Sequence, residues 1–264
     1  MKDLTTMLPE VIALAKNAGS YLIAERQKFS ENNVELKSLN NLVSYVDKKS
    51  EEMIVKGLHE LLPEAGFIAE EGSAQHQGEA YKWIIDPLDG TTNFVHGIPC
   101  YCVSIALMHE EELVLGVIYD PERKESFTAI KGQGAHCNGA PIHVSNRDTI
   151  GGCLFGTGFP YDEFDRMDSY LQLFTHLMRN SRGLRRLGSA AIDLCYVACG
   201  RIDGFYEYGL CPWDVAAGIL IVEEAGGKTS DFKGEKNHIF GEEIIATNEY
   251  IATDMLKLTK QFFY

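Results

Sequence analysis

Two aspartates follow an apolar run in a pattern that suits metal chemistry. The run WIIDPLDGTTNF occupies residues 83–94, with Asp86 at the end of a strand-like segment and Asp89 three residues later. Pro87 and Gly90 favour a turn around the two carboxylates. Mg²⁺ binds proteins through a few carboxylates and commonly shares a substrate phosphate. A plain Asp-Pro and Asp-Gly turn is the alternative, but such a turn does not require two threonines and an asparagine after the glycine.

Two more acidic residues stand at comparable places in the chain. Glu70 follows the strand-like residues 67–69, and Asp214 stands directly before an alanine-rich helical segment. Taken alone, Glu70 could be a solvated loop carboxylate and Asp214 an ordinary helix N-cap. Together with Asp86 and Asp89, they supply four carboxylates on elements whose ends could meet.

The elements that must position these residues mix helix and strand patterns. Helical spacing of apolar residues predicts helices at residues 8–29, from Asp47 as N-cap to Pro63, and at 163–180, 189–199, 214–225 and 249–262. Strands are predicted at residues 67–69, 83–85, 102–108, 113–119, 126–130, 202–207, 226–230 and 243–247. The strands at 102–108 and 113–119 flank a short polar stretch, which predicts an antiparallel hairpin. This mixture predicts layered α and β structure.

Composition narrows the class of protein. The 264 residues include 24 Lys and Arg against 38 Asp and Glu, a net charge of −14, with 45% hydrophobic and 23% charged residues. This balance indicates a folded globular protein, and the negative charge disfavours direct nucleic-acid binding. The seven cysteines are odd in number and lie mostly in apolar runs, which favours buried thiols in a cytoplasmic protein. No segment has the ~20 apolar residues of a membrane span.

The motifs resemble those of the inositol monophosphatase family, part of a group of Mg²⁺-dependent, lithium-sensitive phosphomonoesterases. The resemblance rests on the Asp86–Phe94 run with Glu70-Glu71 before it and WDVAAG, residues 213–218, after it. It extends from Leu36 to Asn248 and includes GQGAHCNG at residues 132–139. The resemblance implies an α+β layered fold, the α-β-α-β-α sandwich of the inositol monophosphatase and fructose-1,6-bisphosphatase sugar phosphatases. It also implies a homodimer whose chain is one catalytic domain, 1–264, with sub-lobes at about 1–145 and 146–264.

The same resemblance implies a role for each matching residue. The metal ligands, for two or three Mg²⁺ ions, would be Glu70, Asp86, Asp89, Asp214 and the Leu88 carbonyl. The catalytic residues would be Glu70, Thr91 and Asp47, the partner of Thr91. The phosphate and substrate contacts would be Gly90, Thr91, Thr92, Gly188, Ser189, Ala190, Glu207 and Arg185. One departure is Asn41, which stands where the family usually has an acidic residue, so a metal or water contact there is in doubt.

The implied reaction is in-line attack of metal-activated water on a small phosphate monoester, assisted by Thr91 and Asp47. A covalent aspartyl-phosphate intermediate is the mechanistic rival. Glu207 and the Gly188–Ala190 segment favour a polyhydroxy leaving group, so inositol monophosphate or a related polyol phosphate is the first expectation. NADP, fructose 1,6-bisphosphate and histidinol phosphate are alternatives that the catalytic residues do not separate. A regulatory binding protein on the same scaffold is the second hypothesis, because some bacterial relatives associate with the transcription machinery.

Overall fold

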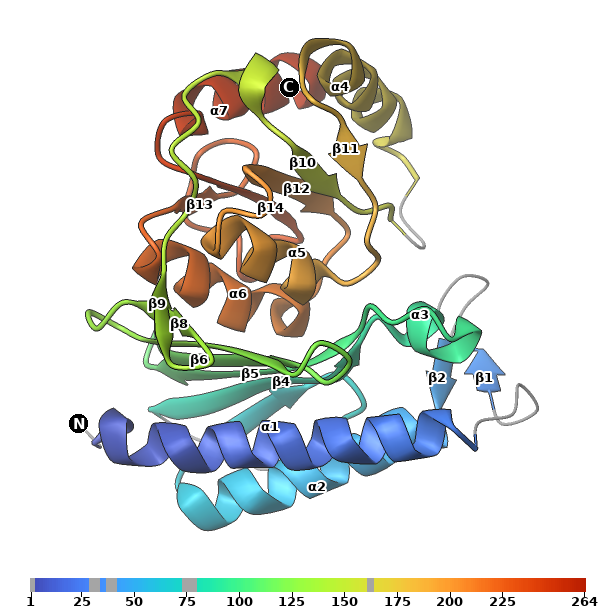
Figure 1. Cartoon of the computed structure of the whole chain (residues 1–264), viewed down its shortest axis with the longest axis vertical. Coiled ribbons are helices and arrows are strands. Elements are labelled where there is room, and N and C mark those ends of the chain that lie inside the picture. The colour runs from blue at the N-terminus through green and yellow to red at the C-terminus, as the bar shows by residue number, and fades with distance from the viewer. Residues whose placement is uncertain (1–2, 29–33, 37–41, 73–79, 161–163) are drawn as a thin grey trace.

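The structure is a computed structural model that describes the chain except residues 1–2, 29–33, 37–41, 73–79 and 161–163. Five layers are stacked in Figure 1, in the order helices, sheet, helices, sheet, helices. The three helical layers are α1 (Leu4–Arg26) with α2 (Tyr45–Leu61), α5 (Ala190–Ala198) with α6 (Pro212–Glu224), and α4 (Met167–Asn180) with α7 (Ala252–Phe263). The predicted α-β-α-β-α sandwich is confirmed.

The first sheet has seven strands that follow one another in sequence order. They are β3 (Gly66–Ala69), β4 (Tyr81–Asp89), β5 (Cys102–His109), β6 (Glu112–Asp120), β7 (Glu125–Ile130), β8 (Ala135–Cys137) and β9 (Ala140–Ile142). Only β3 and β4 pair in parallel, and all other neighbours in this sheet are antiparallel. The predicted hairpin is the β5–β6 pair.

The second sheet has five strands in the order β11-β10-β12-β14-β13. Their bounds are β10 (Phe155–Thr157), β11 (Leu184–Arg185), β12 (Gly204–Tyr208), β13 (Lys228–Ser230) and β14 (Glu243–Thr247). Short β1 (Val34–Leu36) and β2 (Leu42–Ser44) pair with each other, and the six-residue α3 (Thr91–His96) and the 3-10 turn η2 (Ile150–Gly152) complete the described elements.

Both sheets are buried on both faces, and this explains their continuous apolar sequences. In β4, Trp83 and Ile85 pack against α1 and α2, while Ile84 between them joins the core around α5 and α6. The second sheet divides in the same way. Phe205 of β12 faces the central helices, and Tyr206 faces the outer core that α4 and α7 cover. Three cores therefore separate the five layers.

Some predicted boundaries are wrong, for local reasons. Helix α2 begins at Tyr45, so Asp47 is a buried first-turn residue and not the N-cap. Helix α6 begins at Pro212, because proline without a backbone N–H is accommodated in the first turn. The short strands β8 to β11 have too few residues to show a period in sequence, and they were not predicted. The predicted helix limits at residues 29 and 163 lie outside the described residues.

Two further features concern the whole chain. None of the described helices combines the length and apolarity that crossing a bilayer requires. The seven cysteines are free thiols, and burial raises the pKa of the Cys100 thiol to about 12.

Candidate metal centre and substrate site

The first two aspartates lie at a break in the pairing of β4 with β5. Asp86 pairs with Ser104 and Asp89 with Cys102, so the register shifts between them. Such a bulge redirects side chains at a strand end. The Leu88 backbone N–H donates to Asp86 Oδ1 at 2.9 Å, which fixes this carboxylate over the bulge. The Asp-Pro-Leu-Asp segment is therefore a strand end that turns both carboxylates to one side.

Asp89 is buried against the first turn of α5. Its Oδ2 accepts hydrogen bonds from Ser189 Oγ at 2.5 Å and from the Ala191 backbone N–H at 2.8 Å. Ser189 is the N-cap of α5, and Ala190 is its first residue. The start of a helix presents unpaired N–H groups and the positive end of its dipole, which stabilise a carboxylate. The Gly188–Ala190 segment thus supports Asp89 directly.

Asp214 comes from the first turn of α6. Its Oδ2 accepts a hydrogen bond from the Cys211 backbone N–H at 2.6 Å, in a capping box in which Asp214 is the N3 residue. The N-cap itself is Cys211, so the alternative of Asp214 as N-cap is not what the structure shows. The carboxylate caps the helix and still has lone pairs available for another partner.

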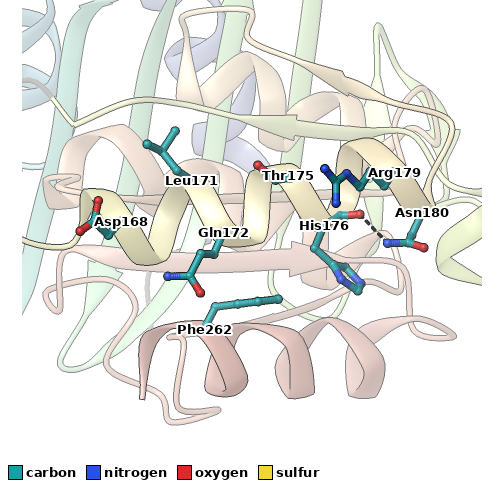
Figure 2. Close-up of a pocket in the computed structure, with 8 residues that line it drawn as sticks. All are labelled: Asp168, Leu171, Gln172, Thr175, His176, Arg179, Asn180 and Phe262. Carbon is teal, nitrogen blue, oxygen red and sulfur yellow. Dashed lines mark hydrogen bonds between the residues drawn. The ribbon is translucent and has the colours of Figure 1, made fainter.

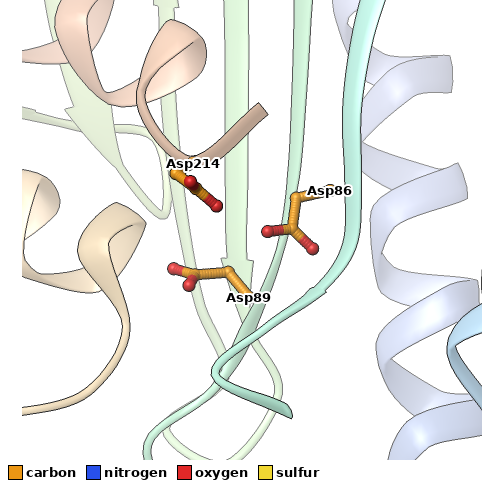
Figure 3. A group of neighbouring side chains, drawn as sticks. All are labelled: Asp86, Asp89 and Asp214. Atoms are coloured by element: carbon orange, nitrogen blue, oxygen red, sulfur yellow. The ribbon is translucent and has the colours of Figure 1, made fainter. Parts of the chain in front are cut away.

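The three aspartates converge from two elements, Asp86 and Asp89 from β4 and Asp214 from α6, as Figure 3 shows. One carboxylate oxygen from each of Asp86, Asp89 and Asp214 lies within 4.8 Å of the others. We call these three residues the carboxylate cluster. Burial raises the pKa of Asp86 well above its usual range, and the charges of Glu70, Asp89 and Asp214 raise it further. Burial likewise raises the pKa of Asp89 and, well above its usual range, that of Asp214. Three crowded, desolvated carboxylates are an unfavourable arrangement without a cation.

Glu70 lies at the edge of this cluster rather than inside it. It directly follows β3, and its backbone N–H donates to the Ile85 carbonyl at 3.4 Å. Its charge contributes to the raised pKa of both Asp86 and Asp214, so its carboxylate faces the cluster. The side chain is half-buried.

Thr91 stands between the cluster and α2. Its Oγ1 lies 3.0 Å from Asp47 Oδ1 and 3.1 Å from the Leu88 carbonyl oxygen. A hydroxyl has one proton, so Thr91 donates to one of these acceptors at a time. The pairing of Thr91 with Asp47 and the place of the Leu88 carbonyl beside them match the arrangement that the resemblance implies. Thr92 follows in α3 and is half-buried.

Gly90 brings the start of α3 close to the second half of the chain. It has φ +95°, and a Cβ there would lie 2.9 Å from the Cys100 carbonyl oxygen and 3.2 Å from that of Gly188. Asn93, two residues into α3, donates through Nδ2 to the carbonyls of Cys100 at 2.7 Å and Leu187 at 2.9 Å. This explains the asparagine in the motif, because it ties α3 to the Gly188 segment.

Glu207 lies on β12 and is buried. A Cβ on Gly158 would lie within 2.0 Å of its carboxyl group, so this glycine makes room for Glu207. Burial raises the pKa of Glu207 to about 8, which the nearby Arg186 partly offsets, and the charges of Asp214 and Asp89 also act on it. Asp193 of α5 is buried nearby, and its Oδ1 has no hydrogen-bond partner among the described residues. Burial therefore favours the protonated form of Glu207, which lies near Asp214 and Asp89 of the carboxylate cluster.

Two adjacent arginines, Arg185 and Arg186, have different surroundings in the structure. Arg185 is exposed, and its Nη1 donates to the Leu184 carbonyl at 2.9 Å. Arg186 instead turns inward, where its guanidinium lies 5.2 Å from the Phe159 ring centroid and lowers the pKa of Glu207. Arg186 is thus the arginine beside Glu207, and the substrate contact predicted for Arg185 stays a prediction. We call Glu207, Gly158, Phe159, Arg186 and Asp193 the Glu207 region.

A shallow pocket of about 580 Å³ lies elsewhere, on the outer layer between α4 and α7. Figure 2 shows its lining, which includes Gln172, His176 and Phe262, with Asn180 Nδ2 donating to the His176 carbonyl at 2.8 Å. Its lining includes one carboxylate, Asp168, and so differs from the group of three carboxylates in the cluster. Asn41, whose role was in doubt, lies outside the described residues.

Sequence reasoning missed two residues that shape the site, Ser50 and Glu51. They follow Asp47 at helical spacing, and this spacing was the available signal. The position of Arg186 beside Glu207 has no such signal, because only the fold brings the two together.

Comparison with known proteins agrees with this geometry. The model of the inositol monophosphatase family matches residues 3–261. "Nus factor SuhB" of Pseudomonas aeruginosa is 43% identical, with 88% of this chain and 90% of that protein aligned. "Inositol-1-monophosphatase" of Mesorhizobium japonicum is 39% identical, with 97% of each covered. The solved inositol monophosphatase of Anabaena (Nostoc) superimposes with a TM-score of 0.86 at 36% identity, covering 99% of this chain and 98% of that one. The chain belongs to the inositol monophosphatase family.

Proposed function

We propose that the protein is a Mg²⁺-dependent phosphomonoesterase that hydrolyses inositol monophosphate or a related small polyol phosphate. The carboxylate cluster carries this proposal. Three carboxylates, those of buried Asp86 and Asp89 and half-buried Asp214, have oxygens within 4.8 Å and raised pKa values, so they need a cation to be ionised together. A relative with this family's fold is named an inositol-1-monophosphatase, which supports the same activity here.

The donor set fits a hard divalent cation. All candidate ligands are oxygens: the carboxylates of Glu70, Asp86, Asp89 and Asp214 and the carbonyl of Leu88. Oxygen-only sites favour Mg²⁺, Ca²⁺ or Mn²⁺ over softer metals. When bound, Mg²⁺ would supply charge stabilisation for the phosphoryl group and activate a water molecule.

Residues of the chain itself would orient the attacking water and accept its proton. The Thr91 hydroxyl, poised between Asp47 Oδ1 and the Leu88 carbonyl, orients a water that approaches the phosphorus and can pass a proton toward Asp47. Gly90 and Thr92 flank this hydroxyl as phosphate contacts. Ser189 and Ala191 fix Asp89 by hydrogen bonds that favour its ionised form and partly offset the effect of burial.

The Glu207 region supports a polyhydroxy leaving group. Its carboxyl group, with a pKa raised to about 8, can donate a hydrogen bond to a substrate hydroxyl in its neutral form and accept one when ionised. The Arg186 guanidinium adds a fixed donor at the same side.

A substrate panel at fixed Mg²⁺ tests the proposal. We expect the highest kcat/KM for inositol monophosphate or a similar polyol monophosphate, and no turnover after chelation of divalent cations. A strong preference for NADP, histidinol phosphate or fructose 1,6-bisphosphate would overturn the substrate assignment. With a chiral phosphate ester we expect inversion at phosphorus, because direct attack by water is a single in-line displacement. Retention would instead indicate two displacements through an aspartyl-phosphate intermediate.

A second candidate function is a regulatory binding protein. The name "Nus factor SuhB" of a relative that is 43% identical favours it. A variant such as Asp86→Asn separates the two roles, since a purely regulatory protein would keep its cellular phenotype without the carboxylate. We also propose that the protein is a homodimer, which sedimentation tests. We propose further that it acts on small phosphorylated substrates without direct nucleic-acid contact, and a DNA- and RNA-binding assay tests the absence of that contact.

A further inference from the structure

One face of α2 carries three fully buried polar side chains. Asp47, Ser50 and Glu51 stand at positions i, i+3 and i+4, so they lie together on the helix surface, and each has 0% exposure. Buried polar groups are retained where they have hydrogen-bond partners, and an isolated buried carboxylate is costly. The partners of these three side chains therefore indicate what this face does.

Each of the three side chains reaches a different segment of the candidate metal centre. Asp47 Oδ1 accepts from Thr91 Oγ1 at 3.0 Å, at the start of α3. Ser50 Oγ donates to the Pro87 carbonyl at 3.0 Å, inside the bulge that carries Asp86 and Asp89. Glu51 Oε2 accepts from a backbone N–H at 2.7 Å, that of the residue directly after Glu70. One helix face thus contacts all the ligand-bearing segments from the first half of the chain.

The hydrogen bond that Glu51 accepts restrains the backbone next to Glu70. Asp86, Asp89 and Asp214 are held by bonds to their own carboxylates, as described above. Glu70 stands outside the tight cluster, and its own backbone N–H makes a long 3.4 Å bond to the Ile85 carbonyl. The adjoining Glu71 N–H is bound to the Glu51 carboxylate at 2.7 Å. A bond from an N–H to a charged acceptor is short and strong, so this bond restrains the backbone on which the Glu70 side chain turns.

We propose that Glu51 is a positioning residue that holds the Glu70 carboxylate in reach of the cluster by binding the Glu71 amide. It acts through the backbone and does not itself touch metal or substrate. The inference rests on the proposed metal-dependent function and adds a residue to it. Partners of this indirect kind typically contribute ten- to a hundredfold to metal affinity.

Mn²⁺ titration of the full-length protein tests the inference, because Mn²⁺ prefers the same oxygen ligands as Mg²⁺ and is measured directly by electron paramagnetic resonance. Glu51→Ala should lower the affinity for the Mn²⁺ ion whose binding depends on Glu70 by about tenfold or more. It should leave the Mn²⁺ bound by the carboxylate cluster unchanged within about twofold. Glu51→Gln keeps a neutral acceptor for the Glu71 N–H and should recover part of the affinity. Glu52→Gln is the matched control, since Glu52 is an exposed neighbour on α2 paired with Lys49 at 2.8 Å.

A double-mutant cycle decides whether Glu51 acts through Glu70. In the Glu70→Gln background, Glu51→Ala should weaken Mn²⁺ binding no further, because the two changes remove one shared effect. Equal weakening in both backgrounds, or a wild-type isotherm for Glu51→Ala, overturns the inference. Where Glu51→Ala does not fold, the same cycle with Glu51→Gln measures the coupling. Failure of the wild type to bind Mn²⁺ would instead refute the proposed function, so the two failures are distinct.

Discussion

The carboxylate cluster and the Glu207 region are neighbours that obtain their properties in different ways. Each aspartate of the cluster stands where an element starts or ends, and backbone N–H groups from the same turn or from α5 fix it. The Glu207 region depends on side chains from separate strands and loops, such as Arg186 over Phe159 and the space that Gly158 leaves. Backbone N–H groups hold each carboxylate of the cluster, with Ser189 Oγ as an additional donor to Asp89, whereas the Glu207 region depends mainly on its neighbouring side chains. Under the proposed function, we therefore expect the cluster to determine the chemistry and the Glu207 region to determine the choice of substrate.

The largest expected effect comes from breaking the cluster. Asp86→Asn should lower kcat/KM by more than about a hundredfold, since even indirect partners of a metal contribute ten- to a hundredfold. Metal-free protein should not be destabilised, because the change removes a charge that its neighbours already disfavour. Initial rates and thermal unfolding in a chelator measure both effects. Turnover within tenfold of wild type would show that the cluster is not the reaction centre.

A smaller effect should separate the two arginines. Arg186→Ala should raise KM by about tenfold, because a hydrogen bond from a charged donor contributes about 1.5 kcal/mol or more. Arg185→Ala is the matched control and should change KM by less than about twofold, as its guanidinium binds its neighbour's carbonyl at the surface. Steady-state kinetics with the same substrate compare the two variants. A larger effect at Arg185 would support the prediction made from sequence.

The smallest effect concerns stability in the Glu207 region. Because the pKa of Glu207 is raised from 4.5 to about 8, the folded state binds its proton more tightly than the unfolded state does. The contribution of this proton to the free energy of unfolding is fully present below about pH 4.5 and is lost as the pH rises through about 8.

Glu207→Gln should therefore flatten the decline in the free energy of unfolding between these pH values, by about 1 kcal/mol per pH unit or less. Urea unfolding of chelator-treated protein at several pH values measures this. Parallel profiles for the two proteins would mean that Glu207 is ionised in the fold.

The sequence predicted the cluster better than its surroundings, and the residues show why. Asp86 and Asp89 lie in one short run after an apolar strand, so local rules place them. Asp214 follows a proline at a helix start, which is again a local signal. Spacing did not indicate that Arg186 lies beside Glu207, because Arg185 ends β11, Arg186 directly follows it, and only tertiary packing orients the two side chains.

The layered fold was predicted from the order of elements and the family resemblance. The pairing of Asp47 with Thr91 was predicted from the resemblance alone, and local spacing gave no sign of it. Asp47 matches the local pattern of an N-cap, because a polar residue before an apolar helical pattern is typical of one. The structure instead buries it against Thr91 from a distant part of the chain. Asn93 likewise fits a turn by its local sequence, although it binds carbonyls of two loops. Long-range hydrogen bonds of this type have no signature in local spacing.

The order in which the chain is synthesised gives the capping of Asp89 a further consequence. Asp89 and its partner Ser189 are 100 residues apart, and Asp214 follows later still. While β4 and its neighbours leave the ribosome and fold, Asp86 and Asp89 have neither the α5 amides nor the third carboxylate. A nascent chain therefore lacks the complete cluster until α6 has emerged, so we expect a divalent ion to bind the cluster only after that point of synthesis.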